Sequence, residues 1–388
     1  MKILHIVPTY YPAFARGGPI WSVHNLNKYL VKAGVDVTVY TTNLDVSKET
    51  PCNKKVIVDG VKVWYFPVSF RPWQYSREMH RALRENMKNF DIVHVTSVFL
   101  SASTLGARYA KKFGKPYLIS PRGSLMREPV MRRHRLAKML YLRLVEKRNL
   151  EQSDAIHFTV PMERKEYEEL GLPLRRALVI PNGIEPDELG APGRPGAFWE
   201  KFGIPKEKRI ILSLGRIDWK KGFDTLIPAF AALLKRIPEA FLVIAGEGGK
   251  GYTEEVKAMV SREGIKDKAL FTGLLTGQDK MAALAEADVF TLPSYAENFG
   301  MAVVEAMYAG IPVVITEGVG IAPDIREARA GVVIKKEKLA LADALTDILS
   351  NEKERVAMGE RGRALVKEKF VMPKITNTWI AAYNKLTS

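Results

Sequence analysis

The stretch Pro293-Ser294-Tyr295-Ala296-Glu297-Asn298-Phe299-Gly300-Met301-Ala302-Val303-Val304-Glu305-Ala306-Met307 joins two apolar segments in the second half of the chain. Residues 288–292 before it and 312–316 after it are short apolar runs typical of buried strands. Between them, Met301–Ala309 predicts a helix that ends at Gly310 and is stopped by Pro312. The stretch therefore predicts a strand, a loop that bends at Gly300, a helix and a return strand. In a parallel sheet such a loop lies at the carboxyl ends of the strands, where open α/β folds bind ligands.

Two carboxylates of this stretch, Glu297 and Glu305, are the first candidate site residues. Glu297 precedes the helix, whereas Glu305 lies inside it among apolar neighbours, so we expect Glu305 to be buried and to need hydrogen-bond donors. The two hydroxyls of a ribose diol would meet that need, and the free amides of residues 298–301 can bind an anion or sugar hydroxyls. The alternative is that Glu297 only caps the helix and that Glu305 is partly exposed.

Apolar strands alternate with amphipathic helices on both sides of this stretch, which predicts parallel, doubly wound sheets. In the second half, strands are predicted at 210–214, 241–245, 269–272, 288–292, 312–316 and 331–334, with helices at 223–236, 252–263, 278–285, 301–309 and 339–349. The first half shows the same alternation from residue 2 to residue 180, with a hairpin at Asp59-Gly60. The Gly- and Pro-rich residues 190–196 predict an interdomain linker.

A second candidate loop, Gly215-Arg216-Ile217-Asp218-Trp219-Lys220-Lys221-Gly222, follows the predicted strand 210–214 and precedes a helix. Arg216 can bind two phosphate oxygens and Lys221 can supply a point charge, and their spacing in a tight loop lets both converge. The alternative is a solvated basic loop, and the sequence leaves open whether Lys220 or Lys221 engages a ligand.

Three motifs of this chain resemble the signature of the retaining glycosyltransferases with two Rossmann-like domains, the GT-B fold. They are Glu297-x7-Glu305 with Phe299-Gly300 inside it, Ala309-Gly310-Ile311-Pro312-Val313-Val314, and Gly215-Arg216 with Lys221-Gly222. The resemblance is closest to the large bacterial family 4 type, the glycosyl transferases group 1, which includes enzymes of surface polysaccharide synthesis. It implies two α/β domains with a cleft between them: residues 1–184 on the acceptor side, joined by a returning helix at about 371–388, and residues 185–370 for the nucleotide sugar.

The resemblance also implies roles for residues of this chain. Arg216 and Lys221 would neutralise the donor pyrophosphate, Glu305 would hold the ribose, and Glu297 would orient the sugar. Further substrate-binding residues implied in this way are Gly17 and Gly18 near the phosphates, Gly246, Gly273 and Leu274 near the nucleobase, and the backbone of Asn298, Phe299, Gly300 and Met301.

Arg122 lies in a loop where the family often has a histidine beside the transferred sugar. This chain has Pro121-Arg122-Gly123 there, so we assign no catalytic histidine. Arg122 is a candidate to bind donor phosphate or an acidic acceptor, and the alternative is an arginine that stabilises a turn.

Composition limits cofactors and location. A single cysteine, Cys52, allows no disulfide within the chain, and no Asp-x-Asp pair is present for a metal-bound pyrophosphate. We therefore expect a metal-independent enzyme without a cofactor, whose donor substrate is a UDP-, GDP- or ADP-sugar. The apolar run at the start is too short and too broken for a signal peptide, and no apolar run reaches 18 residues, so we expect the cytoplasm as the location.

The net charge of +16 favours polyanionic partners, and part of it is concentrated in residues 122–148, where nine basic residues face two acidic ones. A basic helix predicted at 132–150 has the apolar residues Leu136, Met139, Leu140, Leu142, Leu144 and Val145, most of which we expect in the core. Its charged face is a candidate for peripheral contact with anionic lipid, and the alternative is a solvated face.

Three function classes are compatible with these features. The favoured one transfers a hexosyl unit to an acceptor hydroxyl with retention, in surface polysaccharide or glycolipid synthesis, on a sugar or lipid-linked acceptor. A sugar-nucleotide 2-epimerase resembling UDP-N-acetylglucosamine 2-epimerase shares the two-domain architecture. A nucleotide sensor or nucleic-acid-binding protein would use the positive charge, but the sequence has no zinc finger pattern, aromatic sheet motif or basic tail.

Overall fold

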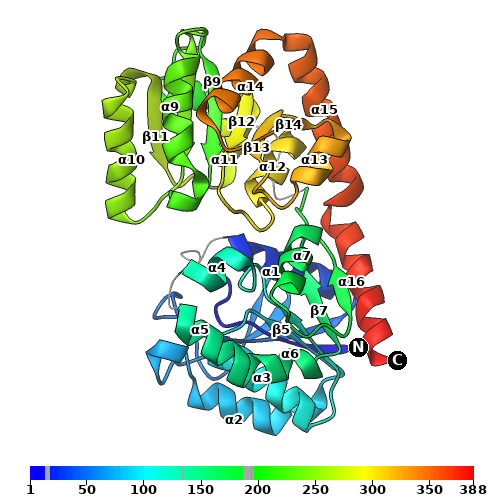
Figure 1. Cartoon of the computed structure of the whole chain (residues 1–388). Coiled ribbons are helices and arrows are strands. Elements are labelled where there is room, and N and C mark those ends of the chain that lie inside the picture. The colour runs from blue at the N-terminus through cyan, green and yellow to red at the C-terminus, as the bar shows by residue number, and fades with distance from the viewer. Residues whose placement is uncertain (14–17, 133–134, 187–193, 195) are drawn as a thin grey trace. The chain divides into compact units, whose positions relative to one another are not determined.

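The computed structural model describes residues 1–13, 18–132, 135–186, 194 and 196–388, and the chain divides into two compact units (Figure 1). The N-terminal unit comprises Met1–Gly183 and Met372–Ser388, and the C-terminal unit comprises Ile184–Val371. Each unit is a sheet of mostly parallel strands covered by helices, so the predicted α/β class with two doubly wound sheets is confirmed.

The N-terminal unit is built on an eight-stranded sheet with the order β3-β4-β2-β1-β5-β6-β7-β8. Its strands are β1 Lys2–Ile6, β2 Asp36–Thr42, β3 Lys55–Val58, β4 Val61–Phe66, β5 Ile92–Thr96, β6 Tyr117–Ser120, β7 Ala155–Phe158 and β8 Ala177–Val179. Only β3 among them runs antiparallel, paired with β4 through the predicted hairpin. Asp59 and Gly60 have φ of 48° and 82° there, the left-handed conformation that a two-residue hairpin turn requires.

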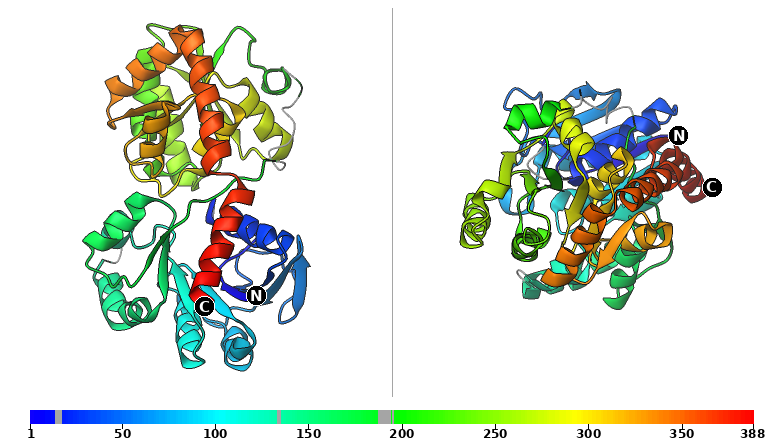
Figure 2. Two further views of the ribbon diagram at one scale, coloured as in Figure 1. Left: turned by 90° about the vertical axis from the view of Figure 1, so that its right-hand side faces the viewer. Right: turned by 90° about the horizontal axis from the view of Figure 1, so that it is seen from above.

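Helices cover both faces of this sheet. They are α1 Gly18–Lys32, α2 Arg77–Asn86, α3 Ser101–Lys112, α4 Arg127–Arg132, α5 Arg135–Tyr141, α6 Lys147–Gln152, α7 Pro161–Glu169 and α16 Met372–Thr387, with the short turns η2 Arg71–Trp73, η3 Met87–Asn89 and η4 Leu142–Glu146. The last helix, α16, packs beside α1 at the other end of the sequence, as Figure 2 shows. Trp379 and Tyr383 of α16 are buried, with their rings against His94 of β5.

The prediction that the apolar residues of the basic helix lie mostly in the core was wrong. Leu136, Leu140 and Leu144 expose 85%, 59% and 68% of their surface, whereas Leu142 is buried. The helix passes from α5 through a π-helical turn, η4, into α6, and its inward face is formed by Leu142, Glu146 and residues 149–150. Helical spacing tells which side chains share a face, but not which face the rest of the protein covers.

The C-terminal unit is built on a six-stranded, wholly parallel sheet with the order β11-β10-β9-β12-β13-β14. Its strands are β9 Arg209–Leu214, β10 Ala240–Ala245, β11 Ala269–Gly273, β12 Val289–Leu292, β13 Val313–Thr316 and β14 Gly331–Ile334. The predicted strands therefore match within one residue at each end. Apolar strands of this kind are typical of a sheet that is covered on both faces.

The helices of this unit are α8 Ala197–Phe202, α9 Phe223–Leu233, α10 Lys250–Arg262, α11 Gly277–Glu286, α12 Met301–Ala309, α13 Ala322–Ala328, α14 Lys338–Ser350 and α15 Glu352–Lys369, with the turns η5 Trp219–Lys221 and η6 Lys266–Lys268. Helix α12 has the predicted bounds, with Gly310 at φ +83° as its C-cap. The short helices α8 and α13 were not predicted. Most of the expected linker, residues 190–193 and 195, lies outside the described residues.

No helix in the described part of the chain is both long enough and apolar enough to cross a membrane.

Candidate functional site

The two candidate loops follow neighbouring strands at the point where the order of the C-terminal sheet reverses. From β9 the chain continues to β10 and β11 on one side, and from β12 it continues to β13 and β14 on the other. Residues 215–222 follow β9 and residues 293–300 follow β12. Crossovers on opposite faces leave a crevice at such a reversal, and this is where open α/β sheets bind ligands.

The two loops are held together by their backbones. The amide of Tyr295 donates a hydrogen bond to the carbonyl of Lys220 at 2.8 Å. Gly222 has a φ of +72°, and a Cβ atom there would lie 2.0 Å from the carbonyl oxygen of Pro293. Only glycine satisfies both the left-handed conformation and this close approach, so Gly222 fixes the spacing of the two loops.

Lys221 and Glu297 form an ion pair between the loops. Lys221 Nζ lies 2.5 Å from Glu297 Oε2, and the side chains are only 18% and 24% exposed. The backbone of Glu297 is held on the other side by Gly318 and Gly320, through hydrogen bonds of 2.9 Å each. Helix α12 has Gly300 as N-cap and no side-chain cap, so the alternative that Glu297 caps the helix does not hold.

Arg216 differs from its lysine neighbours. Its side chain is exposed, and no hydrogen bond or ion pair joins it to any described residue. Lys220 instead lies 5.8 Å from the ring of Trp219, so Lys221 is the lysine that reaches Glu297. The guanidinium of Arg216 thus lies beside the crevice without an acidic partner among the described residues, and it can bind an anion there.

The start of α12 provides backbone donors. Among the described residues, the amides of residues 298–302 donate to no protein acceptor, and Gly300 enters the helix at φ +95°. Phe299 packs its ring against Phe370, so it can offer a ligand only its backbone. Asn298 is partly buried, and its Oδ1 has no partner in the described part of the chain. Free amides at a helix N-terminus favour an anion or a hydroxyl oxygen.

Glu305 is partly exposed rather than fully buried, and the donor that it needs is a basic side chain from α11. Lys280 Nζ lies 2.7 Å from Glu305 Oε1, and the two side chains are 23% and 17% exposed. The sequence interpretation missed Lys280. A signal was present, since Lys280 lies in the first turns of a helix that starts at the same edge of the sheet.

The remaining C-terminal candidates lie at this edge too. Gly246 follows β10, and its amide donates to the carbonyl of Gly273 at 2.7 Å. A Cβ atom on Gly246 would lie 1.9 Å from the carbonyl oxygen of Gly215, so three successive loops are layered backbone against backbone. Leu274, next to Gly273, exposes 60% of its surface and is available as an apolar platform.

In the N-terminal unit, Arg122 lies in the loop after β6 with φ +54°. Glu163 fixes this loop, because its carboxylate accepts the amide of Gly123 at 2.5 Å and that of Thr159 at 2.8 Å. Arg122 Nη1 donates to Asn182 Oδ1, while its Nε is buried without a partner in the described residues. Burial lowers the pKa of Arg122 to about 10, so the side chain stays charged near neutrality.

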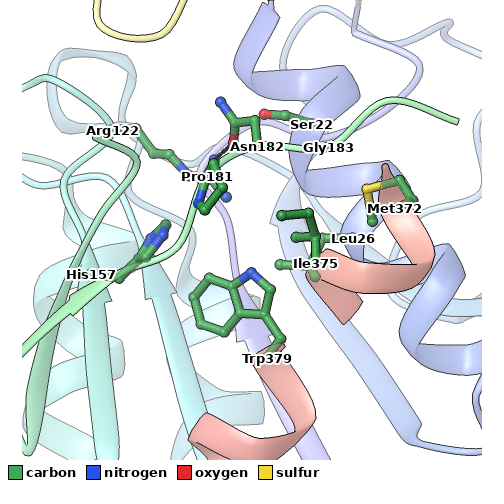
Figure 3. A pocket seen from close by; sticks show the side chains of 10 residues that line it. All are labelled: Ser22, Leu26, Arg122, His157, Pro181, Asn182, Gly183, Met372, Ile375 and Trp379. Carbon is green, nitrogen blue, oxygen red and sulfur yellow. Dashed lines mark hydrogen bonds between the residues drawn. The ribbon is translucent and has the colours of Figure 1, made fainter. Parts of the chain in front are cut away.

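Arg122 and Asn182 border a small pocket of this unit, shown in Figure 3. Its other walls come from α1, α16 and the segment after β8; the lining includes Ser22, Leu26, His157, Pro181, Gly183, Met372, Ile375 and Trp379. Gly18 opens α1, whereas Gly17 lies outside the described residues. The Glu163 contacts were not predicted from the sequence.

Two family models match this chain and between them cover both units. The first, described as "Glycosyl transferase 4-like domain", matches residues 17–183, and the second, "Glycosyl transferases group 1", matches residues 197–365. The chain belongs to the group 1 glycosyl transferases. The candidate loops and helix α12 all lie inside the second matched region.

Curated relatives of this glycosyltransferase are moderately similar. Mannosylfructose-phosphate synthase of Agrobacterium fabrum is 26% identical over 77% of this chain and 71% of the relative. A protein of Mycolicibacterium smegmatis named GDP-mannose-dependent alpha-(1-6)-phosphatidylinositol monomannoside mannosyltransferase is 28% identical over 47% of this chain and 50% of its own length. The chain spans only about half the length of several curated relatives that it matches.

Solved structures show the GT-B fold of the glycosyltransferase along its whole length. Sucrose-phosphate synthase from Thermosynechococcus elongatus superposes with a TM-score of 0.77 at 21% identity, covering 100% of this chain and 99% of that one. Anabaena HepE, solved in complex with UDP-glucose, gives a TM-score of 0.79 at 16% identity, covering 99% and 100%.

Three histidines of the glycosyltransferase, His5, His94 and His157, are buried in the N-terminal unit and fully hydrogen-bonded. His157 Nε2 donates to the carbonyl of Ile180 at 2.8 Å, so its Nδ1 accepts from Ser120 Oγ, which in turn accepts from His94 Nε2. Burial lowers the pKa of all three, that of His5 to about 3. They are neutral packing residues of this unit.

Proposed function

We propose that this glycosyltransferase moves a hexosyl unit from a nucleotide-diphosphate sugar to an acceptor hydroxyl with retention at the anomeric carbon. One observation carries the proposal: loops and the first turns of helices at one edge of one sheet hold Arg216, the Lys221–Glu297 pair, the Lys280–Glu305 pair and the free amides of α12. Binding of a nucleotide sugar requires positive charge near the pyrophosphate and hydrogen-bond acceptors for the hydroxyls of the ribose and the hexose. This edge of the sheet has both.

Arg216 and Lys221 bind the pyrophosphate in this proposal. As the bond between sugar and phosphate breaks, negative charge grows on the departing nucleoside diphosphate, and fixed cations lower the energy of that state. Arg216 is available because no described acidic group holds it. Lys221 exchanges all or part of its contact with Glu297 for a phosphate oxygen.

Glu305 holds the ribose and Glu297 orients the sugar. Both carboxylates are paired with a lysine, so each has an oxygen that the pairing leaves for a hydroxyl donor. The amides at the start of α12 and the buried Oδ1 of Asn298 complete the polar lining. Gly246, Gly273 and Leu274 border the nucleobase.

No enzyme nucleophile and no metal are required in this scheme. The acceptor hydroxyl loses its proton to the leaving phosphate as its oxygen bonds to the anomeric carbon and the bond from that carbon to the phosphate breaks. Positive side chains take the place that a metal ion has in other transferases. The names of the relatives support a nucleotide-sugar donor, since one is called GDP-mannose-dependent and HepE was solved with UDP-glucose.

The acceptor is a sugar or a lipid-linked sugar, and Arg122 is the residue we propose to bind an anionic group of a substrate. Its guanidinium has one donor, Nε, that no described residue uses. We further propose that the enzyme serves surface polysaccharide or glycolipid synthesis from the cytoplasm, in peripheral contact with the inner face of the membrane. Membership of the group 1 glycosyl transferases disfavours the 2-epimerase alternative.

A panel of UDP, GDP, ADP and their sugars tests the donor class. We expect one nucleotide to raise the thermal midpoint of unfolding and its sugar conjugates to do so as well, because ligands that bind the native state stabilise it. The stabilising donor is then incubated with and without acceptor sugars. Product formed only with an acceptor supports transfer, whereas a new sugar nucleotide from donor alone identifies an epimerase. No stabilisation by any member of the panel contradicts the proposal.

A further inference from the structure

The helical segment from Arg135 to Gln152 turns apolar side chains toward solvent. Leu136, Met139, Leu140 and Leu144 are 85%, 41%, 59% and 68% exposed, at a spacing of three, four and eight residues after the first. Residues with this spacing lie on one face of a helix. We call this face, formed by these four side chains, the leucine face. Four of the fourteen large apolar side chains exposed in the described residues thus fall within nine positions.

The orientation of the segment is fixed from the inside. Glu146 is buried and accepts hydrogen bonds from the amide of Phe99 at 3.0 Å, from Thr104 at 3.2 Å and from Asn149 at 3.1 Å. Tyr141 contacts Thr104 through its hydroxyl at 2.9 Å. Rotating the helix to bury the leucine face would strip these buried polar groups of their partners, which is costly. The leucine face is therefore held outward. The opposite side of the segment packs toward α3, and Figure 1 shows α6 and α3 near each other.

Positive charge accompanies the leucine face. Four basic side chains are exposed on the same segment: Arg135, Arg143, Lys147 and Arg148. Of its two acidic residues, Glu146 is buried and Glu151 pairs with Lys147. A long basic side chain can place its stem along apolar surface and its charge at the level of lipid phosphates. A helix with a basic border and an exposed apolar stripe is the type that lies in a membrane interface.

We infer that the leucine face is a docking surface for a lipid bilayer with anionic headgroups, into which Leu136, Leu140 and Leu144 insert. The charge decides between the candidate occupants. A second copy of this chain would bring another +16 to a basic surface, whereas anionic lipid supplies the opposite charge. The inference deepens the proposed function, on which it rests for its purpose: a lipid-linked acceptor would be met at the surface where it lies.

Flotation with vesicles tests the inference. The intact protein is mixed with vesicles of phosphatidylcholine plus phosphatidylglycerol, or of phosphatidylcholine alone, at low and at high salt. We expect binding to the anionic vesicles that weakens as salt rises, because salt screens the lipid charge. The triple variant Leu136→Gln, Leu140→Gln and Leu144→Gln should bind the anionic vesicles at least about tenfold more weakly than the parent.

A matched control removes three exposed apolar side chains from elsewhere. Ile57, Leu339 and Val356 are 57%, 63% and 53% exposed, and their combined replacement by glutamine should leave vesicle binding unchanged. A third variant, Arg143→Gln, Lys147→Gln and Arg148→Gln, should lose most of the salt-sensitive binding.

Insertion itself is read from a fluorophore. An environment-sensitive dye on Leu140→Cys, in a Cys52→Ser background that removes the single natural cysteine, should shift to shorter wavelength with anionic vesicles. The same dye on Leu339→Cys should not shift.

Failure to bind anionic vesicles, or equal binding by the triple leucine variant and the parent, overturns the inference. Binding of the nucleotide found in the donor panel is measured without vesicles on the same preparations. Variants that bind the nucleotide like the parent are folded, so a negative vesicle result then refutes only the membrane surface. If the parent protein binds none of the nucleotides, that result refutes the proposed function and not the membrane surface.

Discussion

The two units share a doubly wound parallel sheet but treat their polar side chains in opposite ways. In the N-terminal unit, His5, His94 and His157 are buried, neutral and joined to hydroxyl, amide and carbonyl groups at 2.7–2.8 Å. In the C-terminal unit, which contains no histidine, the prominent polar groups are lysine–carboxylate pairs at the edge of the sheet, partly open to solvent.

This contrast indicates which polar groups are available for binding. In a buried network every polar group already has a partner. A group that left its partner to bind a ligand would leave a buried donor or acceptor unpaired. A partly exposed ion pair can exchange a partner for a phosphate or a hydroxyl with little loss. The N-terminal histidines therefore stabilise a scaffold, and the C-terminal pairs are the groups that a ligand can engage. Three experiments test this contrast.

Acid should weaken the N-terminal unit before the C-terminal unit. The three histidines have folded-state pKa values far below the unfolded value of about 6.5, so the unfolded state binds protons that the folded state refuses. Their stabilisation is full above pH 6.5 and is lost as the pH falls from there toward the folded pKa values. Three such groups together cost about 4 kcal/mol of unfolding free energy between about pH 7.5 and 5.5.

Hydrogen exchange read separately over peptides of residues 1–183 and 184–371 measures this effect. After correction for the intrinsic exchange rate, protection should fall with acid in the first range and change far less in the second. Parallel loss in both ranges would show that the histidine network does not distinguish the units.

Arg216→Ala should have the next largest effect, on catalysis rather than stability. Removal of a cation that stabilises charge on the leaving group costs about 3 kcal/mol or more, so kcat/KM should fall at least a hundredfold. Steady-state rates with the donor identified by the nucleotide panel measure it. Lys220→Ala is the matched control, because the Lys220 ammonium lies over the ring of Trp219 in the same loop, and we expect a change within about threefold. Near-normal turnover by Arg216→Ala would show that Arg216 does not stabilise the leaving group.

Glu305→Gln should have the smallest effect, on donor affinity. A ribose hydroxyl bonds an ionised carboxylate more strongly than an amide, so the Kd of the nucleoside diphosphate should rise about tenfold while kcat changes little. Calorimetry with the 2′-deoxynucleotide separates this contact from general disruption. The parent should lose affinity when the 2′-hydroxyl is absent, and the variant should not. Equal losses in both proteins would show that Glu305 does not hold the ribose.

Local signals of the sequence predicted a large part of the fold. The alternation of apolar strands and amphipathic helices predicted every strand of the C-terminal sheet, and Asp59-Gly60 predicted the hairpin between β3 and β4. The short helices α8 and α13 were missed because six or seven residues carry too little periodicity to stand out from a loop. The position of Lys221 and Glu297 on facing loops followed from motif resemblance. The start of α11 placed Lys280 at the same edge of the sheet, but its pairing with Glu305 depends on how α11 and α12 pack, which no local pattern predicts.

Backbone preference and apolar periodicity act over a few neighbouring residues. The α/β class, the helix at 301–309 and the charged residues of the two loops could therefore be predicted from the sequence. The folded protein was needed to show that β9 and β12 are adjacent, that Lys280 reaches Glu305, and that Leu136, Leu140 and Leu144 face solvent. These outcomes depend on which segments far apart in the chain pack together, and the free energy that selects them is shared among many contacts rather than written in any single stretch.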